Sequence, residues 1–183
     1  MLENLIVFAL ESESQKRFDD YPVLYTGVGK VNAAYHLTRA IVKKRPQIVI
    51  NLGTAGSQVF ETGSLVCCDR FVQRDIDVSP LGFEKYETPY SNRKIIFQYG
   101  QTVDFLPAGI CGTGDCFDTS FGDPIYQLVD MEAYALAQVC HAEKIPFLCI
   151  KYISDGADGE SHQDWRPSLD DASVKLREIL DRV

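Results

Sequence analysis

The sequence predicts one α/β domain, residues 1–183, built around a mainly parallel, mixed central sheet. The apolar run 146–153 has the length and the β-branched and aromatic content of a buried strand. Between residues 23 and 50, an extended segment, a helical pattern and a second extended segment follow one another, which is the order of a right-handed parallel crossover. A chain of 183 residues with 45% hydrophobic residues can bury a substantial core in one domain.

The first third of the chain supplies four predicted elements. Apolar residues at helical spacing, stopped by Pro46, predict a helix over 30–44. Short apolar runs bounded by turn residues predict strands over 5–10, 23–26 and 48–50, the last of which stops at the glycine-containing segment 51–56.

The middle of the chain is less regular. The segment 75–101 is polar, aromatic and rich in turn residues, so we expect a long excursion with one strand at 95–99. Loops of this length in compact domains usually have a function or move. Apolar runs on either side predict strands over 64–72 and 107–111.

Two helices are predicted in the last third. One covers 131–142 and precedes the strand 146–153. The other begins at Ser168, a preferred N-cap residue, with Asp170 and Asp171 in the first turn, where acidic side chains suit the helix dipole.

Composition argues against several classes of partner. A formal net charge of −8 with scattered basic residues argues against nucleic acid, whose phosphates require clustered cations. The apolar run 5–10 is far too short to cross a bilayer, so we expect no membrane partner and a cytoplasmic location.

The six cysteines lie mostly inside apolar runs and read as small buried residues rather than a disulfide framework. The sequence contains no Cys-x-x-Cys pair, the adjacent Cys67 and Cys68 would point to opposite faces of a strand, and the three histidines are dispersed. We therefore expect neither a metal site nor a cofactor.

Four predicted strands end in small or acidic residues. The segments that follow them are 11–13, 53–56, 112–117 and 154–155. If the strands are parallel, these residues meet at one rim, where ligands of open α/β sheets bind. Asp is also a preferred helix cap, so for Asp155 and Asp158 capping and chemistry are equally good interpretations at this point.

Other motifs give little support to alternative chemistries. Gly27–Lys30 invites a phosphate-loop interpretation, but position 24 is Leu and Val31 replaces the Ser or Thr that holds magnesium, so a tight turn into a helix is favoured. No Gly-x-Ser-x-Gly elbow is present, which disfavours a serine hydrolase. The segment 129–132 either serves a helix dipole or presents a methionine and a carboxylate to a sugar diol.

Together, these segments resemble the purine nucleoside phosphorylase/hydrolase superfamily, and most closely the 5′-methylthioadenosine/S-adenosylhomocysteine nucleosidases. The matching stretches occur in family order and span nearly the whole chain: Ala9–Glu13, Thr26–Val31, Asn51–Gly56, Thr113–Phe117, Val129–Ala133 and Ile153–Asp158. The resemblance implies a three-layer α/β/α fold and hydrolysis of the N-glycosidic bond of an adenosine-type, 5′-thio-substituted purine nucleoside to free base and sugar.

The resemblance also implies two catalytic residues. Asp155 is similar to the family's general acid, which hydrogen-bonds the five-membered ring of the purine, and Ser154 would orient its carboxyl group. Glu13 is similar to the residue that holds the attacking water on the opposite face of the ribose. An oxocarbenium-like transition state gains from such carboxylates, and the base leaves readily only when it is protonated or hydrogen-bonded. Of the two residues Asp155 and Asp158, the resemblance leaves a structural role for Asp158.

The other implied site residues bind substrate. Glu132 would accept from the ribose hydroxyl groups while Met131 packs beneath the sugar, and Phe117 would stack on the base. Trp165 would close over the site. Three further residues would line the sugar side, namely Thr54, Ala55 and Gly56.

The chain departs from the family pattern in two places that matter for substrate. Asp118 stands where an apolar residue is common, and an inward or an outward carboxylate is equally compatible with the sequence. Asp130 stands where Glu is usual. The family also implies a homodimer in which the partner helps to form the 5′ pocket. Candidates for that contribution are Phe83, Tyr86, Pro89 and Tyr90.

Three alternatives stay open beside the nucleosidase. Family phosphorylases often carry an arginine before the Gly-Ser/Thr loop, whereas Asn51 and Leu52 occupy that neighbourhood here, which favours water over phosphate as nucleophile. A nucleosidase of another pathway, such as a futalosine-type hydrolase, shares the same residues. A nucleoside-binding protein without turnover is the third, and the presence of both Glu13 and Asp155 argues against it.

Overall fold

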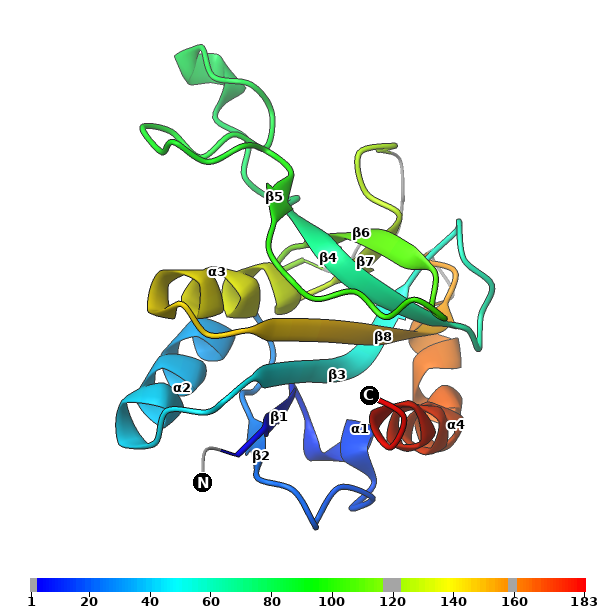
Figure 1. The fold of residues 1–183 in the computed structure, drawn as a ribbon. Helices are drawn as coiled ribbons and strands as arrows, with labels where there is room; N and C mark the ends of the chain where they lie inside the picture. The colour runs from blue at the N-terminus through cyan, green and yellow to red at the C-terminus, as the bar shows by residue number, and fades with distance from the viewer. Residues whose placement is uncertain (1–2, 117–122, 158–160) are drawn as a thin grey trace.

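The protein has a mixed α/β fold in three layers (Figure 1). The computed structural model describes residues 3–116, 123–157 and 161–183, with only the backbone described for 161–164. The strands are β1 Leu5–Phe8, β2 Val23–Tyr25, β3 Val49–Gly56, β4 Leu65–Gln73, β5 Phe97–Gln98, β6 Ala108–Thr113, β7 Leu128–Asp130 and β8 Phe147–Asp155. The helices are α1 Glu11–Ser14, α2 Lys30–Lys43, α3 Ala133–Glu143 and α4 Ser161–Leu180, with a 3₁₀ turn, η1, at Ser79–Leu81. Figure 1 shows α2 and α3 on one side of the sheet and α1 and α4 on the other.

The strands form one sheet in which part of the order closes into a ring. The sheet runs β2-β1-β3-β7-β6-β4-β5, and β8 pairs with both β3 and β4. The ring is therefore β3-β7-β6-β4-β8. Pairings of β1 with β2 and β3, of β8 with β3, and of β6 with β4 and β7 are parallel, and the other three are antiparallel. The prediction of a mainly parallel, mixed sheet is confirmed.

Strand β8 forms the centre of the core, because all nine of its residues are buried between β3 and β4. On one side its residues pack towards α3, with Leu136 fully buried, and on the other towards α4, with Leu176 fully buried. Complete burial of a leucine side chain contributes about 1.5–3 kcal/mol, so these two layers hold both faces of the strand in place.

Strand β3 is longer than predicted. The sequence interpretation ended it at Ile50, before a segment that contains two glycines, yet β3 continues to Gly56, paired with β8 throughout and with one register shift between Ala55 and Gly56. The side-chain amide of Asn51 donates to the carbonyl of Val7 at 3.1 Å, so a polar residue is satisfied inside the sheet. Strand pairing on the β8 side outweighs the weak intrinsic preference of glycine for strands.

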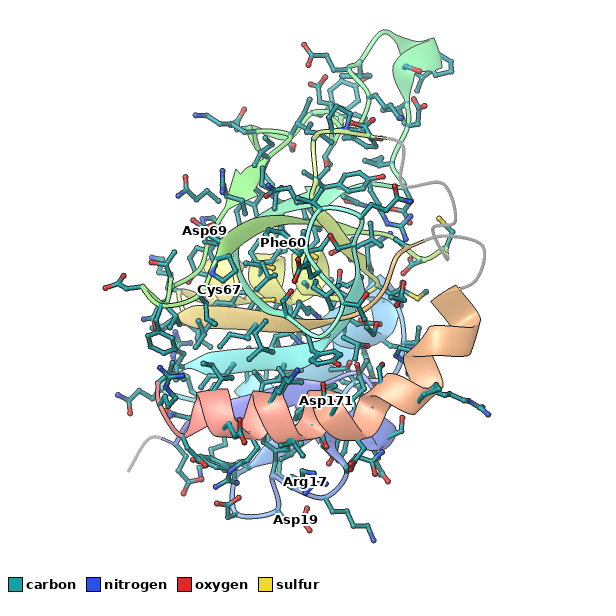
Figure 2. All side chains as sticks on the ribbon, turned by 90° about the vertical axis from the view of Figure 1, so that its right-hand side faces the viewer. Arg17, Asp19, Phe60, Cys67, Asp69 and Asp171 are labelled. Carbon is teal, nitrogen blue, oxygen red and sulfur yellow. The ribbon has the colours of Figure 1, made fainter. Side chains whose placement is uncertain are left out.

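Helix α4 begins at Ser161, so the prediction of an N-cap at Ser168 is wrong. The Ser168 hydroxyl instead donates to the carbonyl of Trp165 at 2.7 Å within the helix. Pro167 also lies inside α4, and Figure 2 shows the helix bending part-way along its length. A proline removes one helical hydrogen bond and bends the helix without ending it here.

The segment between β4 and β5 projects from the body of the protein (Figure 1). Within it, Phe83 packs edge-to-face on Tyr90, whose side chain is 96% exposed. The hydroxyl of Tyr86 donates to Asp123 at 2.7 Å and ties the projection to the start of the segment before β7. The contribution of this projection to a partner's pocket stays a prediction. Across the described ranges, no helix is long and apolar enough to cross a membrane.

Candidate active site

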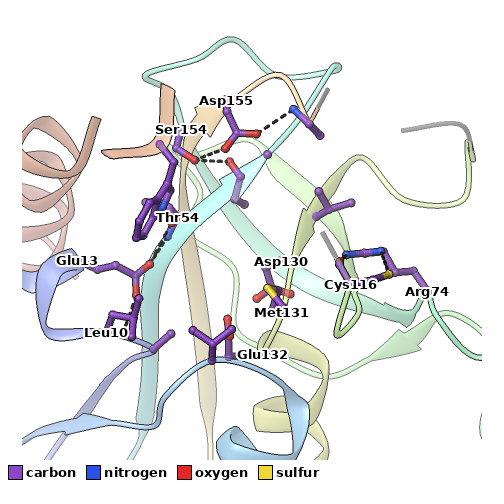
Figure 3. Close-up of a pocket in the computed structure, with 17 residues that line it drawn as sticks. Leu10, Glu13, Thr54, Arg74, Cys116, Asp130, Met131, Glu132, Ser154 and Asp155 are labelled. Carbon is purple, nitrogen blue, oxygen red and sulfur yellow. Dashed lines mark hydrogen bonds between the residues drawn. The ribbon is translucent and has the colours of Figure 1, made fainter. Parts of the chain in front are cut away.

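A cavity of about 270 Å³ opens at the carboxyl ends of β1, β3 and β8, the rim that the sequence predicted (Figure 3). Four acidic residues line it: Glu13 of α1, Asp130 of β7, Glu132 at the start of α3 and Asp155 at the end of β8. The remaining lining is mostly small or apolar and includes Ala9, Leu10, Val28, Thr54, Ala55, Gly56, Arg74, Cys116, Val129, Met131, Ser154, Ala157 and Trp165.

Glu13 is held rigidly in the wall of the cavity. Its side chain is 5% exposed, and Oε2 accepts from the backbone N–H of Leu10 at 3.0 Å. Oε1 accepts from both the backbone N–H and the hydroxyl of Thr54, each at 3.1 Å. These bonds tie α1 to β3, and they fix the carboxylate with few degrees of freedom.

Thr54 has a second partner. Trp165, near the start of α4, donates its indole Nε1–H to the Thr54 hydroxyl oxygen at 2.9 Å. The predicted residues Thr54 and Trp165 thus line the cavity together with Glu13, whose bonds to Thr54 are drawn in Figure 3.

Asp155 ends β8 and is oriented by its neighbours. The Ser154 hydroxyl donates to Oδ2 at 2.6 Å and lies 3.3 Å from the carbonyl of Ala55, while Oδ1 accepts from the backbone N–H of Ala157 at 2.9 Å. The carboxyl group is 7% exposed and faces the cavity (Figure 3).

Gly56 makes room for this arrangement. A Cβ atom at Gly56 would lie 2.6 Å from Asp155 Oδ1 and 2.9 Å from the Cβ of Ala157, closer than real contacts permit. Only glycine therefore allows β3 to approach the Asp155 carboxyl group.

Glu132 lies where α2 and α3 begin. Its Oε1 accepts from the backbone N–H of Gly29 at 2.8 Å, and Gly29 adopts a φ of +95° that favours glycine. Burial, reinforced by the neighbouring Asp130 carboxylate, raises the pKa of Glu132 to about 8. Met131 lines the cavity beside it, as predicted.

The raised pKa of Glu132 has a consequence for stability. Between about pH 4.5 and 8 the folded protein binds a proton at Glu132 that the unfolded chain does not, so stability falls as pH rises through this window. We expect the free energy of unfolding, measured in urea at pH 5, 6.5 and 8, to fall with pH by a few kcal/mol more in the wild type than in Glu132→Gln. Glu178→Gln, an exposed substitution of the same kind, should follow the wild type. If the free energy of unfolding changed with pH in the same way in the wild type and in Glu132→Gln, the raised pKa of Glu132 would be contradicted.

A buried ion pair beneath the cavity was not predicted. Lys151 of β8 lies 2.9 Å from Asp130 of β7, and their side chains are 2% and 1% exposed. Although burial opposes both charges, their attraction holds the pKa of Asp130 below and that of Lys151 above the ordinary value. Lys151 also lies near Glu13, because the position that a Cβ on Gly53 would take is 3.6 Å from Lys151 Nζ and 3.1 Å from Glu13 Oε1. In the sequence, the signal for this ion pair was a single lysine inside an apolar strand.

Asp130 is further fixed by the Thr113 hydroxyl at 2.6 Å and by the backbone N–H of Ala133 at 2.9 Å. A buried charge that keeps an opposite charge and two donors is tolerated, whereas loss of one partner leaves it uncompensated. Asp130 therefore joins β6, β7, β8 and α3 below the cavity.

The side of the cavity opposite Glu13 carries a cation (Figure 3). Arg74 donates from Nη1 to the Cys116 sulfur at 3.3 Å and from Nη2 to the Cys116 carbonyl. Beside it, Lys30 Nζ bonds Asp75 at 2.6 Å and lies 3.3 Å from Asp115. The sequence interpretation did not single out Arg74.

Two predicted site residues, Phe117 and Asp118, lie outside the described residues, as does Asp158. The other nine come together in or around one cavity. Within residues 3–116, 123–157 and 161–183, no group of three or more His, Cys, Asp or Glu side chains is placed to hold a metal ion.

Comparison with known proteins agrees with this geometry. The family model described as the phosphorylase superfamily matches residues 19–108 and 119–183. The 5′-methylthioadenosine/S-adenosylhomocysteine nucleosidase of Haemophilus influenzae (strain PittEE) is 32% identical over 99% of this chain and 90% of its own length. The enzyme of the same name from Staphylococcus aureus (strain MRSA252) is 29% identical over 88% and 79%.

Two solved structures share the fold. One is the Helicobacter pylori 5′-methylthioadenosine/S-adenosylhomocysteine nucleosidase with butyl-thio-DADMe-Immucillin-A, with a TM-score of 0.90, 21% identity, and coverage of 100% of this chain and 97% of that one. The other is a futalosine hydrolase mutant of Helicobacter pylori, with a TM-score of 0.89, 21% identity and coverage of 99% and 97%.

Proposed function

The chain belongs to the phosphorylase superfamily, and from this premise we propose that it is a purine nucleosidase that hydrolyses the N-glycosidic bond of an adenosine-type, 5′-thio-substituted nucleoside. The observation that carries the proposal is the arrangement of Glu13, Glu132 and Asp155 around one cavity. The names of the similar relatives supply the substrate class.

In the proposed reaction, Asp155 is the general acid. It donates a proton or a hydrogen bond to the five-membered ring of the purine as the bond to C1′ breaks, so the base leaves without a full negative charge. Ser154 and the backbone N–H of Ala157 hold the carboxyl group in one orientation. Preorganised groups of this kind need no rearrangement in the transition state.

On the sugar side, Glu132 accepts hydrogen bonds from the ribose hydroxyl groups and Met131 packs beneath the ring. Glu13 takes a proton from a water molecule while the oxygen of that water attacks C1′ from the face opposite the base. The Glu13 carboxylate also stabilises the positive charge that develops on the ribose. Thr54, Ala55, Gly56 and Trp165 form the walls.

Water is the proposed nucleophile because the Glu13 side of the cavity is anionic. Among the described lining residues the one cation, Arg74, lies on the opposite side and is engaged with Cys116. A phosphate ion approaching beside Glu13 would meet a like charge without a compensating cation in the lining. This supports hydrolysis over phosphorolysis.

The test is product analysis with purified protein. Methylthioadenosine, S-adenosylhomocysteine, adenosine, inosine and futalosine are incubated with and without phosphate, and free base, reducing sugar and ribose 1-phosphates are measured. We expect free base and reducing sugar from the thioether nucleosides at a rate independent of phosphate. A phosphate-dependent sugar phosphate would make the protein a phosphorylase, preferential cleavage of futalosine would move it to the other nucleosidase class, and tight binding without cleavage would make it a nucleoside-binding protein.

We also propose that the protein works in the cytoplasm as a homodimer. All six cysteines are free thiols, which suits a reducing compartment. The projection between β4 and β5 carries exposed apolar side chains, with Leu81 74% and Tyr90 96% exposed, and such side chains are typical of contact surfaces.

A further inference from the structure

Trp165, Thr54 and Glu13 form a chain of hydrogen bonds that links three separate segments. The indole Nε1–H of Trp165 in α4 lies 2.9 Å from the Thr54 hydroxyl oxygen in β3. That oxygen lies 3.1 Å from Oε1 of Glu13 in α1.

The chain has only one possible direction. An indole N–H is a donor and never an acceptor, so the Thr54 oxygen must accept from Trp165. A threonine hydroxyl carries a single hydrogen, and Glu13, which acts as the base in the proposed reaction, accepts it. The Thr54 hydrogen therefore points at Glu13 Oε1.

This direction decides which oxygen of Glu13 remains available. Two ionised carboxylate oxygens offer about four acceptor positions. The Thr54 N–H and hydroxyl take two positions on Oε1, and the Leu10 N–H takes one on Oε2. The acceptor position left over is on Oε2.

Building on the proposed hydrolase function, we propose that Trp165 is a positioning residue for the nucleophilic water, acting through the Thr54 hydroxyl to leave Glu13 Oε2 as the water's acceptor. This role goes beyond that of an aromatic cover. Without the indole N–H, the Thr54 hydroxyl can turn its lone pair or its hydrogen elsewhere, and Oε1 becomes a second acceptor that holds water in a less favourable place.

The same ring also contacts the substrate space, because Trp165 lines the cavity. A nucleoside that fills the cavity would therefore contact the side chain that orients Thr54.

The kinetic test separates the indole N–H from the ring. Trp165→Phe keeps an aromatic wall and removes the donor, so we expect kcat to fall roughly fivefold, the value of one hydrogen bond, with KM nearly unchanged. Trp165→Ala removes the wall as well and should raise KM. In the Thr54→Val background, which lacks the hydroxyl, Trp165→Phe should change kcat less than about twofold, since the two effects act through one contact.

A spectroscopic test needs no activity. Trp165 is the only tryptophan of the chain, so its indole Nε1–H gives a single side-chain resonance in a ¹⁵N NMR spectrum. Thr54→Val should shift this resonance and increase its hydrogen exchange. Thr102→Val, a threonine substitution outside the cavity lining, should leave it in place.

The outcomes distinguish this inference from the proposed function. If the wild type releases no base from any nucleoside, the proposed function fails and this inference fails with it. If the wild type is active, equal effects of Trp165→Phe with and without the Thr54 hydroxyl, or an indole resonance unmoved by Thr54→Val, overturn the inference and leave the hydrolase intact.

Discussion

Replacing Asp155 by asparagine should lower turnover by a factor on the order of a hundred or more, the usual value of a general acid–base group. Asparagine keeps an oxygen to accept from the Ala157 N–H, and its amide can donate to Ser154 Oγ, which then turns its hydrogen to the carbonyl of Ala55. The local structure survives while the acidic proton is lost. Steady-state release of free base measures the effect.

Two comparisons make this prediction specific. Asp19→Asn is the same change at an exposed position and should leave turnover unaltered. A riboside whose leaving group is stable as an anion, such as a p-nitrophenyl riboside, does not need protonation, so Asp155→Asn should retain much more of its activity on that substrate. Near-normal turnover of the purine nucleoside by Asp155→Asn would remove Asp155 from the mechanism.

The position of Asp155 at the rim could be predicted because the information for it is local. A strand that ends at Ser-Asp on the rim of a parallel sheet is visible in the sequence, and the structure places the pair there, with Ser154 bonded to Asp155. The resemblance to known nucleosidases then assigned a task to the carboxyl group. What the sequence did not reveal is the requirement for Gly56, because that contact depends on how closely β3 approaches β8.

The features that were missed depend on contacts between distant segments. Lys151 lies in the middle of an apolar strand, and its partner Asp130 comes from a three-residue strand too short to show a pattern. Burial of such a pair is decided by the closed ring of strands, which no periodicity reveals. Arg74 likewise reaches the cavity through the packing of β4 beside β6.

The predicted start of the last helix is wrong for a related reason. Ser168 has the chemistry of an N-cap, yet α4 begins seven residues earlier, at Ser161, and continues through Pro167. Local preferences of about 1 kcal/mol decide a helix end only when no tertiary contact opposes them. Here the bond from Trp165 to Thr54 lies in the extra part of the helix, so the added turns contribute to the site.

Glu13→Gln is the second substitution with a large expected effect. The amide cannot take a proton from water, so turnover should again fall by at least about a hundredfold. Glutamine can still accept from Thr54 or Leu10 with its oxygen, but its NH₂ group then faces a donor, so a moderate loss of stability should accompany the loss of activity. Unfolding in urea, measured beside turnover, separates the two effects.

The stability effect matters for interpretation because Glu13 also has a structural role. Its bond to the Leu10 N–H closes the first turn of α1, and a carboxylate that only served this helix would lose stability when replaced but not turnover. Glu11→Gln, two residues away and exposed, controls for the change of charge near α1. Turnover that survives in a folded Glu13→Gln variant would make the residue a helix cap, and the water would need another base. Turnover that is lost while substrate still binds would place Glu13 at the attacking water, on the face of the ribose opposite Asp155.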